Sequence, residues 1–254
     1  MAIYLDHAAS VPISGEVLET YANALAVAGN PSSTHSFGQN ARMMLEEARE
    51  QLALAVDCDR NEVIFTSGGT EANNLAVKGL FAKREGNLIV TSAAEHHAVL
   101  DVVEHLEAQG AEVHWLSVNS EGQIDLDELK TVLETRGSEV ALVALMWVSN
   151  ETGVITPIGE VTALAAKHGV PVHSDAVAAF GHMPTNFAES GLSTMAITAH
   201  KLGGPVGTGA LIVSRATNLE PLFHGGGQER AIRAGTMDAA GALAFAVALC
   251  VCRH

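Results

Sequence analysis

The feature that most constrains the fold is the regular alternation of short apolar runs with helical patterns from about residue 62 onward. A repeated order of strand, helix and strand is typical of a mostly parallel sheet with helices on both faces. Residues 140–148 are almost all apolar, as expected for a central strand covered on both sides. A chain of 254 residues with 48% hydrophobic content can bury such a core. We therefore expect an α/β fold.

Periodicity and capping residues place the individual elements. We expect strands at residues 62–66, 87–91, 112–118, 140–148, 170–174, 194–198 and 209–214. We expect helices at residues 16–26, at about 41–55, from 70, at 98–109, at 126–136 and at 157–169. Asp125 is the expected N-cap of the helix at 126–136, and Glu128 would complete a capping box. Thr156 is the expected N-cap of the next helix, with Pro157 at its first position.

The charge balance and the chain's start limit its partners. Twenty-nine acidic residues against 14 basic ones give a formal net charge of −15, which argues against a nucleic-acid partner. The opening MAIYLDHAAS lacks the basic and apolar segments of a signal peptide, and no apolar stretch is long enough to span a bilayer. Three cysteines do not indicate a disulfide framework. We expect a cytosolic protein with no membrane partner.

Polar residues follow the ends of the predicted strands. They are Ser67-Gly-Gly-Thr70, Glu95-His-His97, Asn150-Glu-Thr-Gly153, His173-Ser-Asp175 and His200-Lys201. Because active sites of such sheets lie outside the carboxyl ends of the strands, we expect these side chains to converge.

The segment TSGGTEANN, which begins at Thr66, places two glycines and the hydroxyl of Thr70 at the start of a helix. Free backbone N–H groups and the positive end of the helix dipole attract an anion such as phosphate there. A tight strand-to-helix turn with Thr70 as N-cap explains the same residues. The motif alone supports both interpretations equally.

Asp175 and Lys201 stand out for their chemistry. Asp175 follows a short apolar strand, where a carboxylate would stabilise a buried cation such as a protonated pyridine nitrogen. A helix N-cap is the alternative role for this aspartate. Lys201 also follows an apolar strand and precedes glycines, so it could act as a nucleophile toward an aldehyde, although most lysines are simply solvated.

A metal-dependent hydrolase is the competing enzyme class. His96, His97, His173, Asp175 and His200 are of the residue types that bind metals. Their spacing fits neither an HExxH nor a paired CxxC pattern, so we expect no metal site.

Taken together, the segments resemble the cysteine desulfurases, a branch of the class V aminotransferase family of enzymes that depend on pyridoxal 5′-phosphate (PLP). The resemblance covers almost the whole chain. It rests on YLDHAAS at Tyr4, GNPSSTHSFG at Gly29, VIFTSGGTEANNLAVKG at Val63, AEHHAVL at Ala94, VSNETG at Val148, HSDA at His173, AHKLGGP at Ala199 and HGGGQERAIRAGT ending at Thr236. It implies a PLP-dependent transferase fold of type I, with a mainly parallel seven-stranded sheet, helices on both faces and normally a homodimer.

The resemblance also implies residue roles. Lys201 matches the lysine that forms a Schiff base with PLP and moves the substrate Cα proton, Asp175 the carboxylate beside the pyridine nitrogen, and His96 the imidazole stacked on the ring. The other implied cofactor contacts are Gly69, Thr70, Asn150, Thr198, His200 and Thr236. Thr236 matches a position that reaches the cofactor phosphate held by the partner subunit.

The sequence departs from the family at the cofactor ring and at the substrate. Ala178 stands where the family usually has a glutamine that contacts the phenolic oxygen of PLP. The arginine that holds the substrate carboxylate belongs to the C-terminal small domain, which we expect to be largely absent. Arg230 and Arg233 are then the nearest substitutes, and an apolar face is expected to be left uncovered.

The third departure concerns the nucleophile. The family carries a persulfide-forming cysteine on a mobile loop of the small domain, and neither Cys58, Cys250 nor Cys252 matches it. We expect these three cysteines to be structural or incidental.

The implied activity is removal of sulfur from L-cysteine to give L-alanine and a persulfide, used for iron–sulfur cluster or thiocofactor assembly with a sulfur-acceptor or scaffold protein. We expect residues 1–15 to be the N-terminal segment of the small domain and residues 16–254 to form the large PLP-binding domain. Two alternatives stay open. One is a catalytically incomplete member that binds PLP without desulfuration, and the other is a related selenocysteine lyase or class V aminotransferase.

Overall fold

The computed structural model describes residues 3–252, which are built around one seven-stranded sheet. Its strand order is β1-β7-β6-β5-β4-β2-β3. The strands are β1 (Val63–Thr66), β2 (Leu88–Ser92), β3 (Glu112–Leu116), β4 (Val140–Ala144), β5 (Val172–Asp175), β6 (Thr194–Thr198) and β7 (Gly209–Val213). β7 runs antiparallel to both of its neighbours, whereas the other pairings are parallel. The mainly parallel seven-stranded sheet is therefore confirmed.

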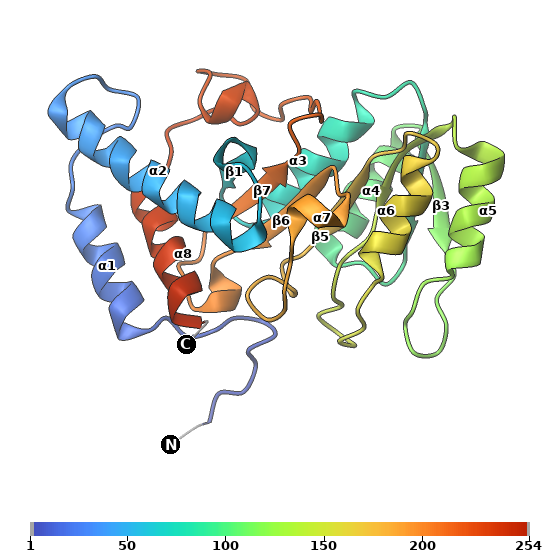
Figure 1. Cartoon of the computed structure of the whole chain (residues 1–254), viewed down its shortest axis with the longest axis horizontal. Helices are drawn as coiled ribbons and strands as arrows, with labels where there is room; N and C mark the ends of the chain where they lie inside the picture. The colour runs from blue at the N-terminus through green and yellow to red at the C-terminus, as the bar shows by residue number, and fades with distance from the viewer. Residues whose placement is uncertain (1–2, 253–254) are drawn as a thin grey trace.

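Helices cover both faces of the sheet (Figure 1). One face carries α3 (Gly69–Phe81) and α4 (His97–Ala108). The other carries α2 (Ser36–Val56), α5 (Leu126–Arg136), α6 (Ile158–Ala166), α7 (Phe187–Ser190) and α8 (Ala239–Cys252), with α1 (Gly15–Leu25) packed on α8. Alternate side chains of a strand feed the two cores, so Val63 and Phe65 join one cluster and Ile64 the other. Three short 3₁₀ segments complete the fold: η1 (Arg60–Glu62), η2 (His200–Leu202) and η3 (Glu229–Ala231).

Helix α8 is apolar on every side. This composition suits its position, because the helix contacts both α1 and α2 and shares a core cluster with the sheet. Phe245 of this helix packs edge-on against Phe180, with ring centroids 6.0 Å apart. Burial inside the domain thus explains the apolar residues from Ala244 to Leu249, whereas Cys250 and Cys252 at the end of the helix are exposed.

The η3 turn is backbone-strained and anchored by a buried ion pair. Glu229, Arg230 and Ala231 all have positive φ values, of 40°, 58° and 60°, a region that costs a residue other than glycine about 1–2 kcal/mol. The guanidinium of Arg49 in α2 donates to both carboxylate oxygens of Glu229, at 2.9 and 2.6 Å. Glu229 also accepts from the backbone N–H of Phe65 at 2.8 Å, which ties the turn to β1.

Several predicted boundaries and caps are wrong. β4 ends at Ala144 instead of residue 148, because the chain beyond it continues to bond to β5 without regular strand geometry. The carboxylate of Asp125 accepts from the N–H groups of Asp127 and Glu128 as expected. There is no capping box, however, because the Glu128 side chain bonds instead to the N–H of Ser117 and the ring of His114.

Helix α6 also begins later than predicted. Its first residue is Ile158, its N-cap is Pro157 and no side chain caps it. Thr156 is buried and donates its backbone N–H to the carbonyl of Trp147, so it belongs to the preceding turn. The helix ends at Ala166 and not at residue 169.

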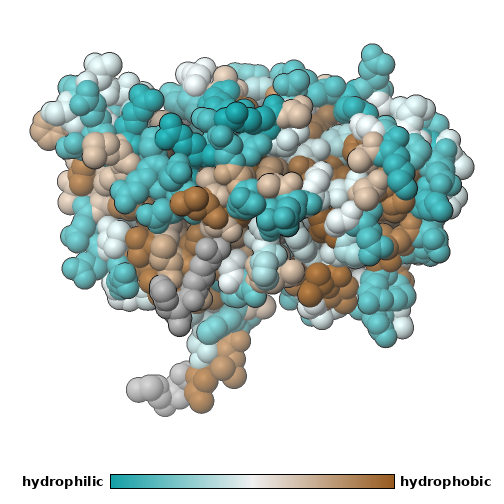
Figure 2. Space-filling model, in the orientation of Figure 1, coloured by the Kyte–Doolittle hydropathy of each residue, from teal (hydrophilic) through white to brown (hydrophobic). Residues whose placement is uncertain are grey.

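Apolar side chains are exposed on part of the surface. Figure 2 shows them gathered over α1 and α8, at the lower left, and on the N-terminal segment. Leu18 and Leu25 of α1 are 53% and 60% exposed, and Ile3 and Leu5 are each 83% exposed. Within residues 3–252, no helix combines the length and apolar character that a bilayer crossing requires.

Candidate active site

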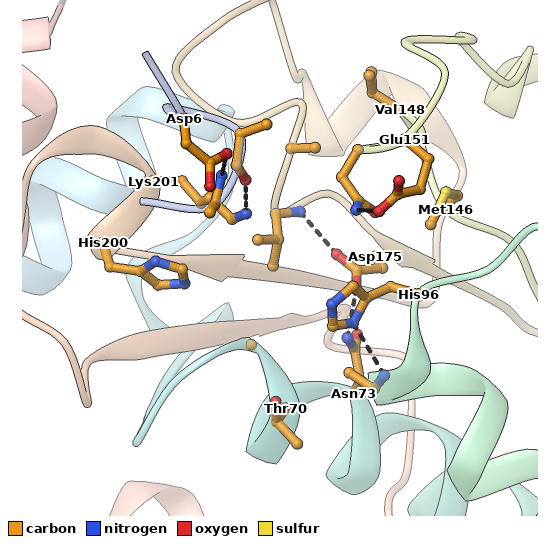
Figure 3. A pocket seen from close by; sticks show the side chains of 17 residues that line it. Asp6, Thr70, Asn73, His96, Met146, Val148, Glu151, Asp175, His200 and Lys201 are labelled. Atoms are coloured by element: carbon orange, nitrogen blue, oxygen red, sulfur yellow. Dashed lines mark hydrogen bonds between the residues drawn. The ribbon is translucent and has the colours of Figure 1, made fainter. Parts of the chain in front are cut away.

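A cavity of about 530 Å³ opens at the carboxyl ends of the parallel strands (Figure 3). Seven of the nine predicted cofactor residues line it: Gly69, Thr70, His96, Asn150, Asp175, His200 and Lys201. They come from the segments that follow β1, β2, β4 and β6 and from the end of β5. The predicted convergence of strand-end residues is therefore what the fold produces. Their cofactor roles stay predictions.

Lys201 lies in η2, half-buried at the cavity wall. Its ammonium Nζ donates to the backbone carbonyl of Ala8. Burial lowers the pKa of Lys201 below its usual 10.5, although the nearby carboxylates of Asp175, Asp6 and Glu151 act in the opposite direction. A lowered pKa increases the fraction of neutral amine at a given pH, and the neutral amine is the form that attacks a carbonyl carbon.

Asp175 ends β5 and is only 6% exposed. Its Oδ1 accepts from the N–H of Val177 at 2.9 Å, and its Oδ2 accepts from the side-chain amide of Asn73 at 2.6 Å. Burial raises the pKa of Asp175 above its usual 3.8, and these two hydrogen bonds oppose that rise. A cation placed in the cavity would further favour the ionised carboxylate.

His96 and the start of α3 complete the polar lining. His96 is the N-cap of α4, and its Nδ1 accepts from the N–H of Ala98 at 3.0 Å, which leaves the proton on Nε2. Helix α3 begins after Gly68, whose φ is 139°, and no side chain caps it. A methyl group on Gly69 would lie 2.8 Å from Cγ2 of Val177, so only glycine allows this close approach. The helix thus presents backbone N–H groups to the cavity edge.

The N-terminal segment forms a wall that sequence reasoning missed. Asp6, Ala8 and Ala9 line the cavity, and the N–H of Val11 donates to the carbonyl of His200 at 2.9 Å. Nothing in this segment carries a local signal for such a contact, because it depends on the distant η2. The assignment of residues 1–15 to a small domain stays a prediction.

Two predicted cofactor residues and both candidate arginines lie outside the cavity wall. Thr198 is buried, with its hydroxyl donating to the carbonyl of Thr208 at 3.1 Å. Thr236 is exposed in the loop before α8, so it could serve only a second chain. Arg233 is paired with Glu71, at 2.8 Å from Nε to Oε1, and Arg230 donates to the carbonyl of Asn61. Neither arginine replaces the family's substrate clamp at this cavity.

The cysteines are not placed for catalysis at the cavity, and all three lie within the described residues. None of Cys58, Cys250 and Cys252 lines it. Burial, together with nearby carboxylates, raises the pKa of Cys58 to about 12, so its thiol is protonated at neutral pH. Residues 3–252 also contain no cluster of three or more His, Cys, Asp or Glu side chains suited to a metal ion.

The donor set fits PLP. An uncapped helix start suits the phosphate, the buried carboxylate of Asp175 suits a protonated ring nitrogen, the amine of Lys201 suits the aldehyde, and the imidazole of His96 suits the ring face. Ala178 lines the same cavity, so the expected glutamine contact is missing at the place where the family makes it. The seven predicted cofactor residues named above do line the cavity.

The amino-acid sequence is similar to known proteins whose family fits this site. Residues 3–253 match the family described as "Aminotransferase class-V". This chain belongs to that family. Enzymes of the family depend on PLP. A relative from Mycobacterium tuberculosis, described as "IscS-like cysteine desulfurase", is 47% identical over 251 residues, which are 96% of this chain and 64% of the relative. "Cysteine desulfurase IscS" from Dictyoglomus turgidum is 44% identical, over 97% of this chain and 63% of the relative.

Solved structures extend the likeness to the fold. A "NIFS-like protein" superposes with a TM-score of 0.94 at 32% identity, covering 99% of this chain and 70% of that one. A structure titled "SspA in complex with cysteine" superposes with a TM-score of 0.92 at 33% identity, covering 98% and 72%. The chain spans about 64% of the length of the first of these sequence relatives.

Glu95, beside His96, gives the site a pH-sensitive neighbour. It is 7% exposed; its Oε1 accepts from the N–H of Met146 at 2.7 Å, and its buried Oε2 has no hydrogen-bond partner among the described residues. Burial raises the pKa of Glu95 well above 4.5, and the charge of Asp175 adds to this. A carboxyl whose pKa is raised by folding contributes stability below its unfolded pKa and loses it as the pH rises through the folded pKa.

We therefore expect Glu95→Gln to stabilise the protein at alkaline pH. At pH 9 the variant should have a free energy of unfolding about 1–3 kcal/mol above that of the wild type, and at pH 4 the two should be nearly equal. Urea unfolding at the two pH values measures this. Glu107→Gln, at an exposed position of helix α4, which follows Glu95, is the control and should show no such pH dependence. Equal alkaline stability of Glu95→Gln and wild type would contradict the prediction.

Proposed function

We propose that this chain contains the PLP-binding domain of a cysteine desulfurase that removes sulfur from L-cysteine and leaves L-alanine. The observation that carries the proposal is the convergence of Lys201, Asp175 and His96 on one cavity beside an uncapped helix start. The proposal also draws on the relatives, which include cysteine desulfurases 47% and 44% identical to this chain.

Each side chain has a distinct task in this proposal. When bound, PLP supplies an electron sink for negative charge at the substrate Cα. Asp175 would keep the ring nitrogen protonated, the α3 start and His200 would hold the phosphate, and His96 would cover the ring face. Lys201 would hold the aldehyde carbon through Nζ, and its neutral amine would move the proton at the substrate Cα. The lowered pKa of Lys201 suits both tasks, because each needs the neutral amine.

The sulfur step requires a thiolate that attacks the substrate sulfur. The carbon–sulfur bond breaks, the sulfur stays on the attacking thiolate as a persulfide, and the carbon skeleton takes up a proton to become alanine. Cys58, Cys250 and Cys252 lie away from the cavity, so we propose that this thiol comes from outside residues 3–252. A sulfur acceptor for iron–sulfur cluster or thiocofactor assembly would then receive the sulfur.

Assembly and location follow from the same proposal. We propose a homodimer in which Thr236, exposed beside η3, reaches the phosphate held by the partner subunit. We place the protein in the cytosol, a compartment that keeps cysteine thiols reduced.

The second candidate is a family member that binds PLP without desulfuration. It is favoured by Ala178 at the cavity, where a ring contact is lost, and by the absence of a cysteine from the cavity wall formed by residues 3–252. A selenocysteine lyase or another class V aminotransferase would use the same lining with a different substrate.

The deciding experiment is a PLP titration of the purified chain, followed by visible absorption, borohydride reduction and peptide mapping. The expected result is a visible band that borohydride removes, with the phosphopyridoxyl mass on Lys201 and on no other lysine. Incubation with L-cysteine and a thiol reductant should then release alanine. Labelling without alanine selects the PLP-binding candidate without desulfuration, and a screen for pyruvate, keto acids or selenide tests the other substrates. No label at Lys201 refutes PLP binding through this residue.

A further inference from the structure

Behind the cavity, four buried polar side chains form one continuous hydrogen-bonded chain. Its members, Thr194, His173, Asn73 and Asp175, are 0%, 0%, 0% and 6% exposed. The distances are 2.9 Å from Thr194 Oγ1 to His173 Nδ1, 2.9 Å from His173 Nε2 to Asn73 Oδ1, and 2.6 Å from Asn73 Nδ2 to Asp175 Oδ2. The hydrogen-bonded chain connects β6, β5 and α3, and its last two members, Asn73 and Asp175, line the cavity.

The direction of these hydrogen bonds follows from their chemistry. The Asn73 amide N–H donates to Asp175, so the Asn73 oxygen accepts and His173 must carry its proton on Nε2. Burial lowers the pKa of His173 to about 3, so the ring is neutral and its Nδ1 is an acceptor. The hydroxyl of Thr194 therefore donates to that nitrogen. All three bonds point toward Asp175, and such bonds polarise one another in the same sense.

We propose that Asn73 is a positioning residue, which ties Asp175 to this one-directional chain and keeps its carboxylate ionised and facing the cavity. The inference rests on the proposed function for the identity of the cation that Asp175 would meet. Asn73 is not among the residues predicted from the sequence to form the site. The side-chain amide of Asn73 suits this role, because its oxygen accepts a hydrogen bond from His173 while its nitrogen donates one to Asp175.

The charges around Asp175 show why a donor is needed here. His96 and Lys201 favour its ionised form from the cavity side, whereas burial opposes ionisation. Glu95, at the end of the β2–α4 connection, is the other carboxyl that interacts with it. A charge-assisted bond of 2.6 Å is among the strong ones. Without the Asn73 amide, Asp175 would hold a proton more often and would bind a protonated ring nitrogen less well.

The test is a carbon-13 NMR titration of the Asp175 carboxyl in the PLP-free protein. Asn73→Ala should raise the pKa of Asp175, and Thr194→Val, at the far end of the chain, should raise it by less. The same Asn73→Ala protein should bind PLP about tenfold or more weakly at neutral pH, as judged by fluorescence titration. A tenfold loss of affinity corresponds to about 1.4 kcal/mol.

The matched control is Thr162→Val. Thr162 is buried in α6, and its hydroxyl donates to the carbonyl of Ser190 at 2.6 Å, away from the cavity. This variant loses a buried hydrogen bond but should leave the pKa of Asp175 unchanged. An unchanged or lowered Asp175 pKa in Asn73→Ala, or an equal rise in Thr162→Val, would overturn the inference. If Asn73→Ala does not fold, the Thr194→Val titration decides. A wild type that does not bind PLP refutes the proposed function but leaves the NMR result valid.

Discussion

Replacing Arg49 with methionine is expected to lower the free energy of unfolding by about 3–5 kcal/mol, because it leaves the Glu229 carboxylate buried without its counter-charge. The Glu229 side chain is 1% exposed, and the pair is bidentate. Arg49 also donates to the carbonyl of Val63 at 2.6 Å and lies 4.9 Å from the centre of the Phe65 ring. Its loss should also release the left-handed η3 turn. Urea unfolding followed by circular dichroism measures the change.

The variant Arg49→Met/Glu229→Gln provides the internal check. Its neutral amide oxygen can still accept from the N–H of Phe65, so part of the lost stability should return. Glu46→Gln removes the more exposed partner of Arg49 and should cost less than about 1 kcal/mol. A double variant less stable than Arg49→Met would show that the buried charge is not the cause.

The second large effect is expected from Lys201→Ala. The variant should lose the borohydride-sensitive band and the labelled peptide completely, since no other lysine lines the cavity within residues 3–252. If the chain forms alanine from L-cysteine, that rate should fall at least about 10²–10⁴-fold, as expected when a general base is removed. Absorption spectra and alanine release provide the two readouts.

Two further variants separate charge from nucleophilicity. Lys201→Arg keeps a cation near Asp175 but has no amine to attack the aldehyde, so it should also remain unlabelled. Lys83→Ala removes a lysine whose ion pair with Glu220 lies on the surface, and it should behave as the wild type. Retained labelling in Lys201→Ala would show that the cofactor attaches elsewhere.

Local sequence patterns predicted those parts of the fold that local forces determine. The helix at Leu126–Arg136 and the strand at Thr194–Thr198 have the predicted bounds, because amphipathic spacing defines the helix and a short apolar centre between two threonines defines the strand. The failures involve tertiary competition. Glu128 would close a capping box in an isolated helix, but the fold brings Ser117 and His114 within its reach.

The candidate site shows the same division. The rule that ligands bind at the carboxyl ends of parallel strands brought Asp175 and Lys201 together correctly. Ala8 could not be predicted, since its backbone carbonyl has no residue-specific signal. Asn73 had one that was overlooked: asparagine is a poor residue for a helix interior, and two occur side by side at residues 73–74. A buried partner for such a residue is the physical reason to retain it.

The contact between Ala8 and Lys201 joins positions 193 residues apart. The cavity wall is therefore built from segments at both ends of a very long loop in the chain. Closing such a loop costs conformational entropy, and contacts between residues far apart in sequence form more slowly than local ones. During synthesis the site cannot exist until η2 has emerged from the ribosome and packed against the N-terminal segment. A cofactor that uses this complete cavity would therefore bind only after η2 has packed against the N-terminal segment, and would not guide the earliest steps of folding.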